Sequence, residues 1–223
     1  MKAHIFDLDG TLLDSMGVWI QIDRDFLDSR GIAFPEDDVY EKYVETVTPL
    51  NPHESAAHAI EYFGLNDTIE NVMNEWNERA MSAYKNRIPL KPGAAEYLQH
   101  LRSQNAKMAI ATSSPAVLCM PALHKHGITD LFNAICLSEE VGCGKSRPDV
   151  FLLAAQKLNA APSDCIVYED NLIAINTAKS IGMTVCGVCD LYSKNMWDEI
   201  EKAADFVIRD FNEGSVHLWD LKI

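Results

Sequence analysis

The sequence HIFDLDGT at residues 4–11 determines how the rest of the chain is interpreted. Residues 4–7 are predicted to form a strand, and Asp7 and Asp9 stand where that strand ends. Two carboxylates so close together are unfavourable unless a positive charge lies between them. Gly10 permits the sharp turn that would bring Asp9 back toward Asp7. An Asp-Gly pair is also common in ordinary solvated turns, so this segment alone leaves both interpretations open.

Strands and helices alternate from residue 89 onward. Strands are predicted at 106–112, 133–137, 165–169, 184–189 and 205–208, with helices starting near 115 and spanning 150–158 and 172–181. The strands are almost continuously apolar, which is typical of a parallel sheet covered by helices on both faces. In such sheets, ligands bind outside the carboxyl ends of the strands. The residues at those ends are therefore the candidates for function.

Residues 15–86 differ from the rest of the chain and are predicted to form a helical insert. Apolar residues recur there at helical spacing, with no convincing strand. Residues 15–88 carry 14 acidic and 6 basic residues, which is more than half of the net charge of −14. The expected domains are an α/β core made of residues 1–14 and 87–223, and a helical domain made of residues 15–86.

Hydroxyl side chains follow the strand at 106–112. Ser114 is predicted to cap a helix whose first residue is Pro115. Thr112 and Ser113 would then lie at a helix N-terminus, where hydroxyls and free amides favour an anion. Capping alone explains Ser114 but leaves Thr112 and Ser113 without a role.

Lys145 precedes another predicted helix start. Ser146 and Asp149 have the S-x-x-D spacing of a capping box, and Lys145 could reach from there into a site as a positive charge. Gly144-Lys145-Ser146 also matches the end of a P-loop, but that motif requires glycine at position 139, where this chain has glutamate. We therefore reject a P-loop.

Two adjacent acids, Glu169 and Asp170, follow the strand at 165–169. Such a pair at a strand end suits a hard cation such as Mg²⁺. The alternative is that Asp170 or Asn171 caps the next helix, and both roles can be present together.

Taken together, these strand ends resemble the haloacid dehalogenase superfamily. Its four motifs match Asp7-Leu8-Asp9-Gly10-Thr11, Thr112-Ser113, Lys145 with Pro148-Asp149, and Glu169-Asp170. The helical insert resembles the cap of the branch that contains β-phosphoglucomutase and phosphoglycolate phosphatase. The resemblance implies a three-layer α/β/α Rossmann-like core with a parallel sheet and an inserted all-helical cap.

The resemblance also implies a role for each motif residue. Asp7 would be the nucleophile that forms an aspartyl-phosphate, and Asp9 the general acid and base. Mg²⁺ would be held by the carboxylates of Asp7 and Asp170 and the main-chain carbonyl of Asp9, with Glu169 as a further ligand or a partner of one. Thr112, the Ser113 amide and Lys145 would bind the phosphate oxygens. Asp14 is expected to be structural, at the hinge into the cap.

The expected activity is hydrolysis of a small phosphorylated metabolite, a phosphomonoester such as a sugar phosphate. A β-phosphoglucomutase-like mutase is the alternative, but the stretch expected to correspond to its basic, glycine-containing cap loop, residues 43–48, has neither feature. A non-catalytic phosphate-binding module is a third interpretation, which the intact acids and Lys145 disfavour.

Five residues of the predicted cap could contact a substrate, but most of them are expected to lie in the cap core or on its surface: Trp19, Asp23, His53, His58 and Trp76.

Composition limits the partners and the compartment. A 223-residue chain with a net charge of −14 lacks the basic surface that nucleic acid or an anionic membrane requires. No apolar stretch approaches the length of a membrane span, and the N-terminus does not resemble a signal peptide. The six scattered cysteines are expected to be free thiols. We expect a cytoplasmic monomer or small homo-oligomer.

Overall fold

The computed structural model, which describes residues 2–190 and 193–212, contains a six-stranded parallel sheet in the order β3-β2-β1-β4-β5-β6. The strands are β1 (Ala3–Phe6), β2 (Lys107–Thr112), β3 (Ala134–Leu137), β4 (Cys165–Glu169), β5 (Thr184–Val188) and β6 (Phe206–Ile208). Each lies within or one residue from its predicted range. The order reverses at β1, so β1 lies in the middle of the sheet with β2 and β4 on its two sides.

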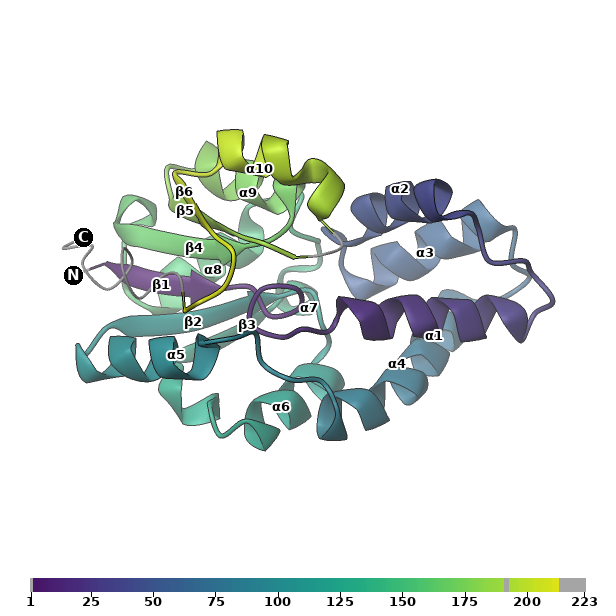
Figure 1. Ribbon diagram of the computed structural model, residues 1–223, viewed down its shortest axis with the longest axis horizontal. Helices are drawn as coiled ribbons and strands as arrows, with labels where there is room; N and C mark the ends of the chain where they lie inside the picture. Colours follow the sequence, from purple (N-terminus) through teal and green to yellow (C-terminus); the bar gives the residue numbers. More distant parts are fainter. Residues whose placement is uncertain (1, 191–192, 213–223) are drawn as a thin grey trace.

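Helices cover both faces of the sheet, as Figure 1 shows. Side chains alternate along β1: Phe6 packs in the same cluster as α5 (Ala94–Ser103) and α6 (Ala116–Lys125), and Ile5 packs on the opposite face. That second face is covered by α8 (Asp149–Lys157), α9 (Leu172–Ser180) and α10 (Trp197–Ala203). The predicted three-layer α/β/α architecture is confirmed. The other short elements are α7 (Ser138–Val141) and the 3₁₀ turns Thr129–Leu131, Pro162–Asp164 and Lys194–Met196.

Four helices between β1 and α5 lie together beyond the carboxyl ends of the strands (Figure 1). They are α1 (Met16–Asp28), α2 (Asp37–Val47), α3 (Pro52–Phe63) and α4 (Ile69–Asn86). Their apolar faces pack on one another; for example, the rings of Phe26 and Trp76 lie 5.7 Å apart. Their core is continuous with the sheet face under α5 and α6.

The chain enters and leaves this helical group at one crossing point. Leu13 and Leu90 form an antiparallel bridge, and the Asp14 amide donates to the Pro89 carbonyl at 3.1 Å. The Lys91 amide donates to the Leu12 carbonyl at 2.8 Å. The predicted domain boundaries at 14/15 and 86/87 lie beside this crossing. Two short backbone segments therefore connect the helical group to the sheet.

Two helix-start predictions are wrong. α8 begins at Asp149 with Pro148 at the cap position and no side-chain cap, so Ser146 and Asp149 form no capping box. α6 begins one residue after Pro115, and the Ser114 side chain donates to Asp9 instead of capping the helix. The capping role of Asn171 is confirmed: its side chain accepts from the amides of Ile173 and Ala174.

Residues 43–47, expected to correspond to a substrate loop, form the end of α2. Five of the six cysteines are free thiols in buried positions, and Cys189 is half-buried. Within the described part of the chain, no helix combines the length and apolar composition that crossing a membrane requires.

Candidate active site

Three neighbouring strands bring the predicted site residues together. Phe6 lies in register with Ile110 of β2 and with Tyr168 of β4, so these three parallel strands end at the same edge of the sheet. The Asp7 amide extends this pairing by donating to the Tyr168 carbonyl at 2.9 Å. Parallel strands place their carboxyl ends side by side, and the central position of β1 puts Asp7 between the other two.

Lys145 reaches this edge from the loop before α8. Its ammonium donates to the Asp7 carboxylate and, at 2.8 Å, to Oε2 of Glu169. Lys145 is 3% exposed. Burial alone would lower the pKa of Lys145, but the Asp7 and Glu169 carboxylates outweigh it and raise that pKa, so the side chain stays charged.

Asp7, Glu169 and Asp170 form a buried acidic cluster. Each offers a carboxylate oxygen, and these oxygens all lie within 4.8 Å of one another. Burial, followed by the charge of Asp7, raises the pKa of Glu169 to about 7. Burial and the charge of Glu169 also raise the pKa of Asp170. Lys145 supplies one positive charge for three acids, so the donor set fits a hard divalent cation such as Mg²⁺.

Gly10 makes room for this cluster. Its φ is +84°, and a Cβ placed there would lie 2.3 Å from Oδ2 of Asp170. Any other residue would therefore have to displace the Asp170 carboxylate as well as adopt a strained backbone. The neighbouring Thr11 hydroxyl donates to Oδ1 of Asp170 at 3.0 Å. The turn after β1 thus fixes the position of a residue that is 160 positions away in the sequence.

The Asp9 carboxyl group is held apart from this cluster. Its Oδ1 accepts from the hydroxyls of Ser15, at 2.6 Å, and Tyr84, and its Oδ2 accepts from the Ser114 hydroxyl. Burial raises the pKa of Asp9, and the three hydroxyl donors counteract part of that rise. Trp19 donates its indole N–H to the Tyr84 oxygen at 2.7 Å, which fixes the phenol.

The sequence predicts only part of this arrangement around Asp9. It does not identify Ser15 or Tyr84, and it predicts that Ser114 caps a helix. Ser15 lies six residues after Asp9, a spacing that could have suggested a contact across the turn. Tyr84 lies 75 residues away on α4, and only tertiary packing brings it to Asp9.

Thr112 and Ser113 lie at the end of β2, where they line a cavity that Asp7 and Asp9 also line. The Thr112 hydroxyl accepts from the Ser114 amide at 2.9 Å and keeps its own proton for donation. The Ser113 hydroxyl lies 3.3 Å from that of Ser138. The three predicted phosphate-binding residues, Thr112, Ser113 and Lys145, all line this cavity.

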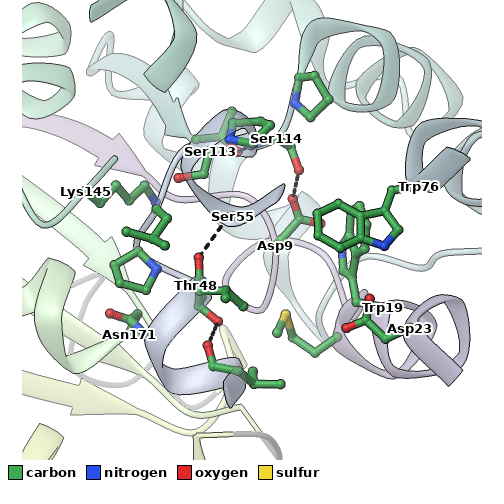
Figure 2. Close-up of a pocket in the computed structure, with 18 of the residues that line it drawn as sticks. Asp9, Trp19, Asp23, Thr48, Ser55, Trp76, Ser113, Ser114, Lys145 and Asn171 are labelled. Atoms are coloured by element: carbon green, nitrogen blue, oxygen red, sulfur yellow. Dashed lines mark hydrogen bonds between the residues drawn. The ribbon is translucent and has the colours of Figure 1, made fainter. Parts of the chain in front are cut away.

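This cavity of about 170 Å³ lies between the sheet edge and the helical group. Figure 2 shows Lys145, Ser113 and Asn171 on one side and Trp19, Asp23 and Trp76 on the other. Its walls on the helical side include Trp19, Asp23, Tyr40, Tyr43, Val44, Val47, Thr48, Ser55, Met73, Trp76 and Asn77. Among the insert residues noted from sequence, Trp19, Asp23 and Trp76 line the cavity, whereas His53 and His58 are not among its described lining residues. Trp76 also belongs to the hydrophobic core and Trp19 packs against it, so the expected core position and the position on the cavity wall coexist.

Comparisons with known proteins agree with this geometry. The family model described as haloacid dehalogenase-like hydrolase matches residues 4–188. The phosphorylated carbohydrates phosphatase of Thermotoga maritima is 27% identical over 183 residues, covering 82% of each chain. The β-phosphoglucomutase of Bacillus subtilis is 31% identical over 199 residues, covering 84% of this chain and 83% of that protein.

A solved structure supports the fold. CbbY from Rhodobacter sphaeroides, in complex with phosphate, aligns over 96% of both chains with a TM-score of 0.84 at 22% identity. The match of the family model to most of the sequence, including the ends of β1, β2 and β4 and the loop of Lys145, settles the membership. The chain belongs to the haloacid dehalogenase-like hydrolase family.

Proposed function

We propose that this protein is a Mg²⁺-dependent phosphatase that hydrolyses a small phosphomonoester through Asp7. The observation that supports this proposal most directly is that the two carboxylates after β1 have different environments. Asp7 is paired with Lys145 beside two further acids, and Asp9 accepts from three hydroxyls. Two acids with separate environments suit one nucleophile and one proton carrier.

The reaction has two steps. Asp7 attacks phosphorus, the bond from phosphorus to the ester oxygen breaks, and Asp9 gives a proton to that departing oxygen. Water then attacks the aspartyl-phosphate while Asp9 accepts its proton, which regenerates both acids. The hydroxyls of Ser15, Tyr84 and Ser114 hold Asp9 during both transfers. The Thr112 hydroxyl, the Ser113 amide and the Lys145 ammonium bind the phosphate oxygens as charge develops on them.

Asp7 and Asp170, with the main-chain carbonyl of Asp9, would hold the metal. When bound, Mg²⁺ supplies the positive charge that lets a carboxylate approach a phosphate dianion. Glu169 is better suited to a supporting role. Its Oε2 accepts from Lys145, and its Oε1 accepts from the amides of Asp170 and Asn171 at 3.2 Å each. Glu169 therefore orients Lys145 and the turn that carries Asp170.

Residues 15–86 act as a cap over this site. Support comes from the single crossing at Leu13 and Leu90 and from the cavity wall that α1, α2 and α4 provide. The backbone of the loop between α2 and α3 touches the loop of Lys145: the Lys145 amide donates to the Pro49 carbonyl. A cap closed in this way excludes water and encloses the leaving group.

The named relatives favour a sugar phosphate or a similar metabolite as substrate, since one is a phosphorylated carbohydrates phosphatase. The mutase alternative has a relative too, the Bacillus subtilis β-phosphoglucomutase. It has less support, because a mutase handles a bisphosphate and Lys145 is the only basic side chain among the described residues that line the cavity. Hydrolysis, with water as the acceptor, is the better match.

The test is hydrolysis of an aryl phosphate by the purified protein. Phosphate release should require Mg²⁺, stop with a chelator, and fall by several orders of magnitude in Asp7→Asn, while Asp14→Asn, an exposed control beside the hinge, keeps the wild-type rate. The proposal is overturned if no phosphate is released from the aryl ester or from a panel of metabolites, while glucose 1-phosphate is isomerised in the presence of a bisphosphate activator.

A further inference from the structure

Resting on the proposed phosphatase reaction, we propose that Asp23 and Trp76 form a subsite that binds a hydroxyl of an uncharged, single-ring leaving group. We call these two residues the distal pair. They lie on the cap side of the cavity, across from Lys145 (Figure 2). The substrate class is then a monophosphate of a neutral polyol of monosaccharide size.

The first observation is the Trp76 indole nitrogen. Trp76 is 9% exposed and lines the cavity, and its Nε1 is buried with no hydrogen-bond partner among the described residues. A buried N–H without an acceptor is unfavourable. The other cavity tryptophan, Trp19, has its N–H satisfied by Tyr84. A substrate oxygen would give Trp76 the acceptor that the protein does not provide.

The second observation is the Asp23 carboxyl group, which lines the same cavity from α1. The Tyr40 hydroxyl donates to its Oδ2 at 2.7 Å and fixes its orientation. Burial raises the pKa of Asp23 to about 7. A carboxyl group has two oxygens, so the one Tyr40 bond leaves it capacity for a substrate hydroxyl. Asp23 and Trp76 therefore offer an acceptor and a donor, which is the complement of a hydroxyl.

Charge selects against a second anion at this end. Lys145 is the only basic residue among the described residues of the cavity wall, and it belongs to the phosphate end. A distal phosphate or carboxylate would be buried there with no cation among these lining residues to offset it, which is strongly unfavourable whatever the charge of Asp23. Bisphosphates and phosphorylated carboxylic acids are therefore disfavoured as substrates.

Size and shape favour one ring. The cavity of about 170 Å³ includes the phosphate end and is close in volume to the roughly 150 Å³ of a protein cavity known to bind benzene, so the leaving group can be no larger than one ring. Its cap-side walls are mostly aromatic and aliphatic and include Trp19, Tyr43 and Met73 as well as the distal pair. Such walls pack against the apolar face of a sugar ring while the polar pair takes its hydroxyl.

The experiment compares substrates and variants by kcat/KM with Mg²⁺ present. Substrates are a set of hexose and pentose monophosphates, their deoxy analogues, sugar bisphosphates, 2-phosphoglycolate and an aryl phosphate. Variants are Asp23→Ala, Trp76→Phe and, as a control at an exposed position of the helix that carries Asp23, Asp25→Ala. We expect neutral monophosphates to be preferred by the wild type. The two distal variants should lower the ratio of sugar phosphate to aryl phosphate activity about tenfold, mainly through KM, as expected for one lost hydrogen bond.

Deoxy analogues and a charge reversal complete the test. One deoxy sugar phosphate should be a poorer substrate for the wild type but equal to its parent for Asp23→Ala, because that variant has no side-chain acceptor for the hydroxyl. Asp23→Lys should shift preference toward bisphosphates or 2-phosphoglycolate. The subsite is refuted if the wild type prefers those anionic substrates, or if the distal variants leave the substrate ratio unchanged. In both cases the aryl phosphate is still hydrolysed, whereas failure of the proposed function would abolish that activity in the wild type.

Discussion

The Tyr84 hydroxyl, on the last helix of the insert, donates a hydrogen bond to the Asp9 carboxylate at the end of β1. The proposed acid and base is therefore positioned partly by a residue of the insert. Because Tyr84 also accepts from Trp19, a side chain of the cavity wall is linked to Asp9 through one phenol. This arrangement connects the position of the insert with the position of the proton carrier.

We expect Tyr84→Phe to lower kcat about tenfold, the effect of removing one hydrogen bond to a charged group. Burial raises the pKa of Asp9 and the hydroxyl donors lower it, so losing one donor raises it further. The intermediate is hydrolysed with Asp9 as the base, so the rising limb of the kcat against pH profile should move to higher pH.

The control for this variant is Tyr62→Phe, which removes a phenol hydroxyl from an exposed position on α3. It should leave both kcat and the pH profile as they are in the wild type. A Tyr84→Phe profile superimposable on that of Tyr62→Phe would show that the bond to Asp9 has no influence on proton transfer.

Gly10 and Gly182 allow a direct test of the close approach to Asp170. Both have positive φ, +84° and +81°, but a Cβ at Gly182 meets nothing within 4 Å whereas at Gly10 it meets the Asp170 carboxylate. Alanine at either position should destabilise the fold by about 1–2 kcal/mol through the backbone. Only Gly10→Ala should also raise the Mg²⁺ concentration needed for half-maximal activity, by at least about tenfold. Thermal unfolding and Mg²⁺ titrations of activity distinguish the two effects, and equal Mg²⁺ requirements would contradict the assignment of Asp170 to the metal.

Glu54 links the insert to the loop that carries Lys145. Its Oε2 accepts from the Asn51 amide in the capping box of α3 and from the Gly144 amide, both at 3.0 Å. The backbones meet closely there, since a Cβ on Gly144 would lie 2.3 Å from the Pro49 carbonyl oxygen. We expect Glu54→Ala to weaken closure of the cap and to raise KM several-fold.

Asn51→Ala is the matched control for Glu54→Ala. It removes the side chain that accepts from the Glu54 amide, a cap contribution of about 1 kcal/mol, but leaves the Glu54 carboxylate for Gly144. Both variants should unfold at lower temperature, and only Glu54→Ala should change KM. If KM rises equally in both, the effect comes from α3 stability and not from closure.

The sequence was sufficient to predict which strand ends lie together, because that grouping follows from local pattern. Asp7, Thr112 and Asp170 each end an apolar run, and parallel strands align such ends wherever the strands are neighbours. The sequence does not show the strand order, but the order of the motifs along the chain was enough to group these strand ends at one site. Lys145 was identified from its position before a helix, although the expected capping box there was wrong because Pro148 occupies the cap position.

The sequence could not predict contacts made by helix packing. Tyr84 contacts Asp9 from 75 residues away, and Tyr40 contacts Asp23 from 17 residues away. No sequence motif marks either pair. The position of Asp23 and Trp76 on a cavity wall depends on how four helices pack, which apolar periodicity does not specify. Ser114 shows the same limit: a hydroxyl at a helix start could serve the helix or the site, and only the structure decides between them.

His4 gives a prediction about stability that is independent of catalysis. Its ring is buried, lies 3.0 Å through Nδ1 from the Tyr168 hydroxyl, and has a pKa lowered to about 4 by burial. An unfolded chain protonates this histidine near pH 6.5 and the folded chain does not. Stability should therefore fall as pH decreases from 6.5 to 4, by about 3 kcal/mol from this residue.

His4→Phe isolates this contribution, because phenylalanine can keep the stacking on Tyr168 and cannot be protonated. The raised pKa of Glu169 acts in the opposite direction, since its stabilising neutral form is lost as pH rises, but this term is common to both proteins and cancels in the difference. Urea unfolding at pH 7, 6 and 5 should show the free energy of unfolding of the wild type falling relative to that of His4→Phe as pH decreases. The exposed His124→Gln should follow the wild type at every pH. Parallel curves for wild type and His4→Phe would mean that His4 is protonated in the folded protein as readily as in the unfolded chain.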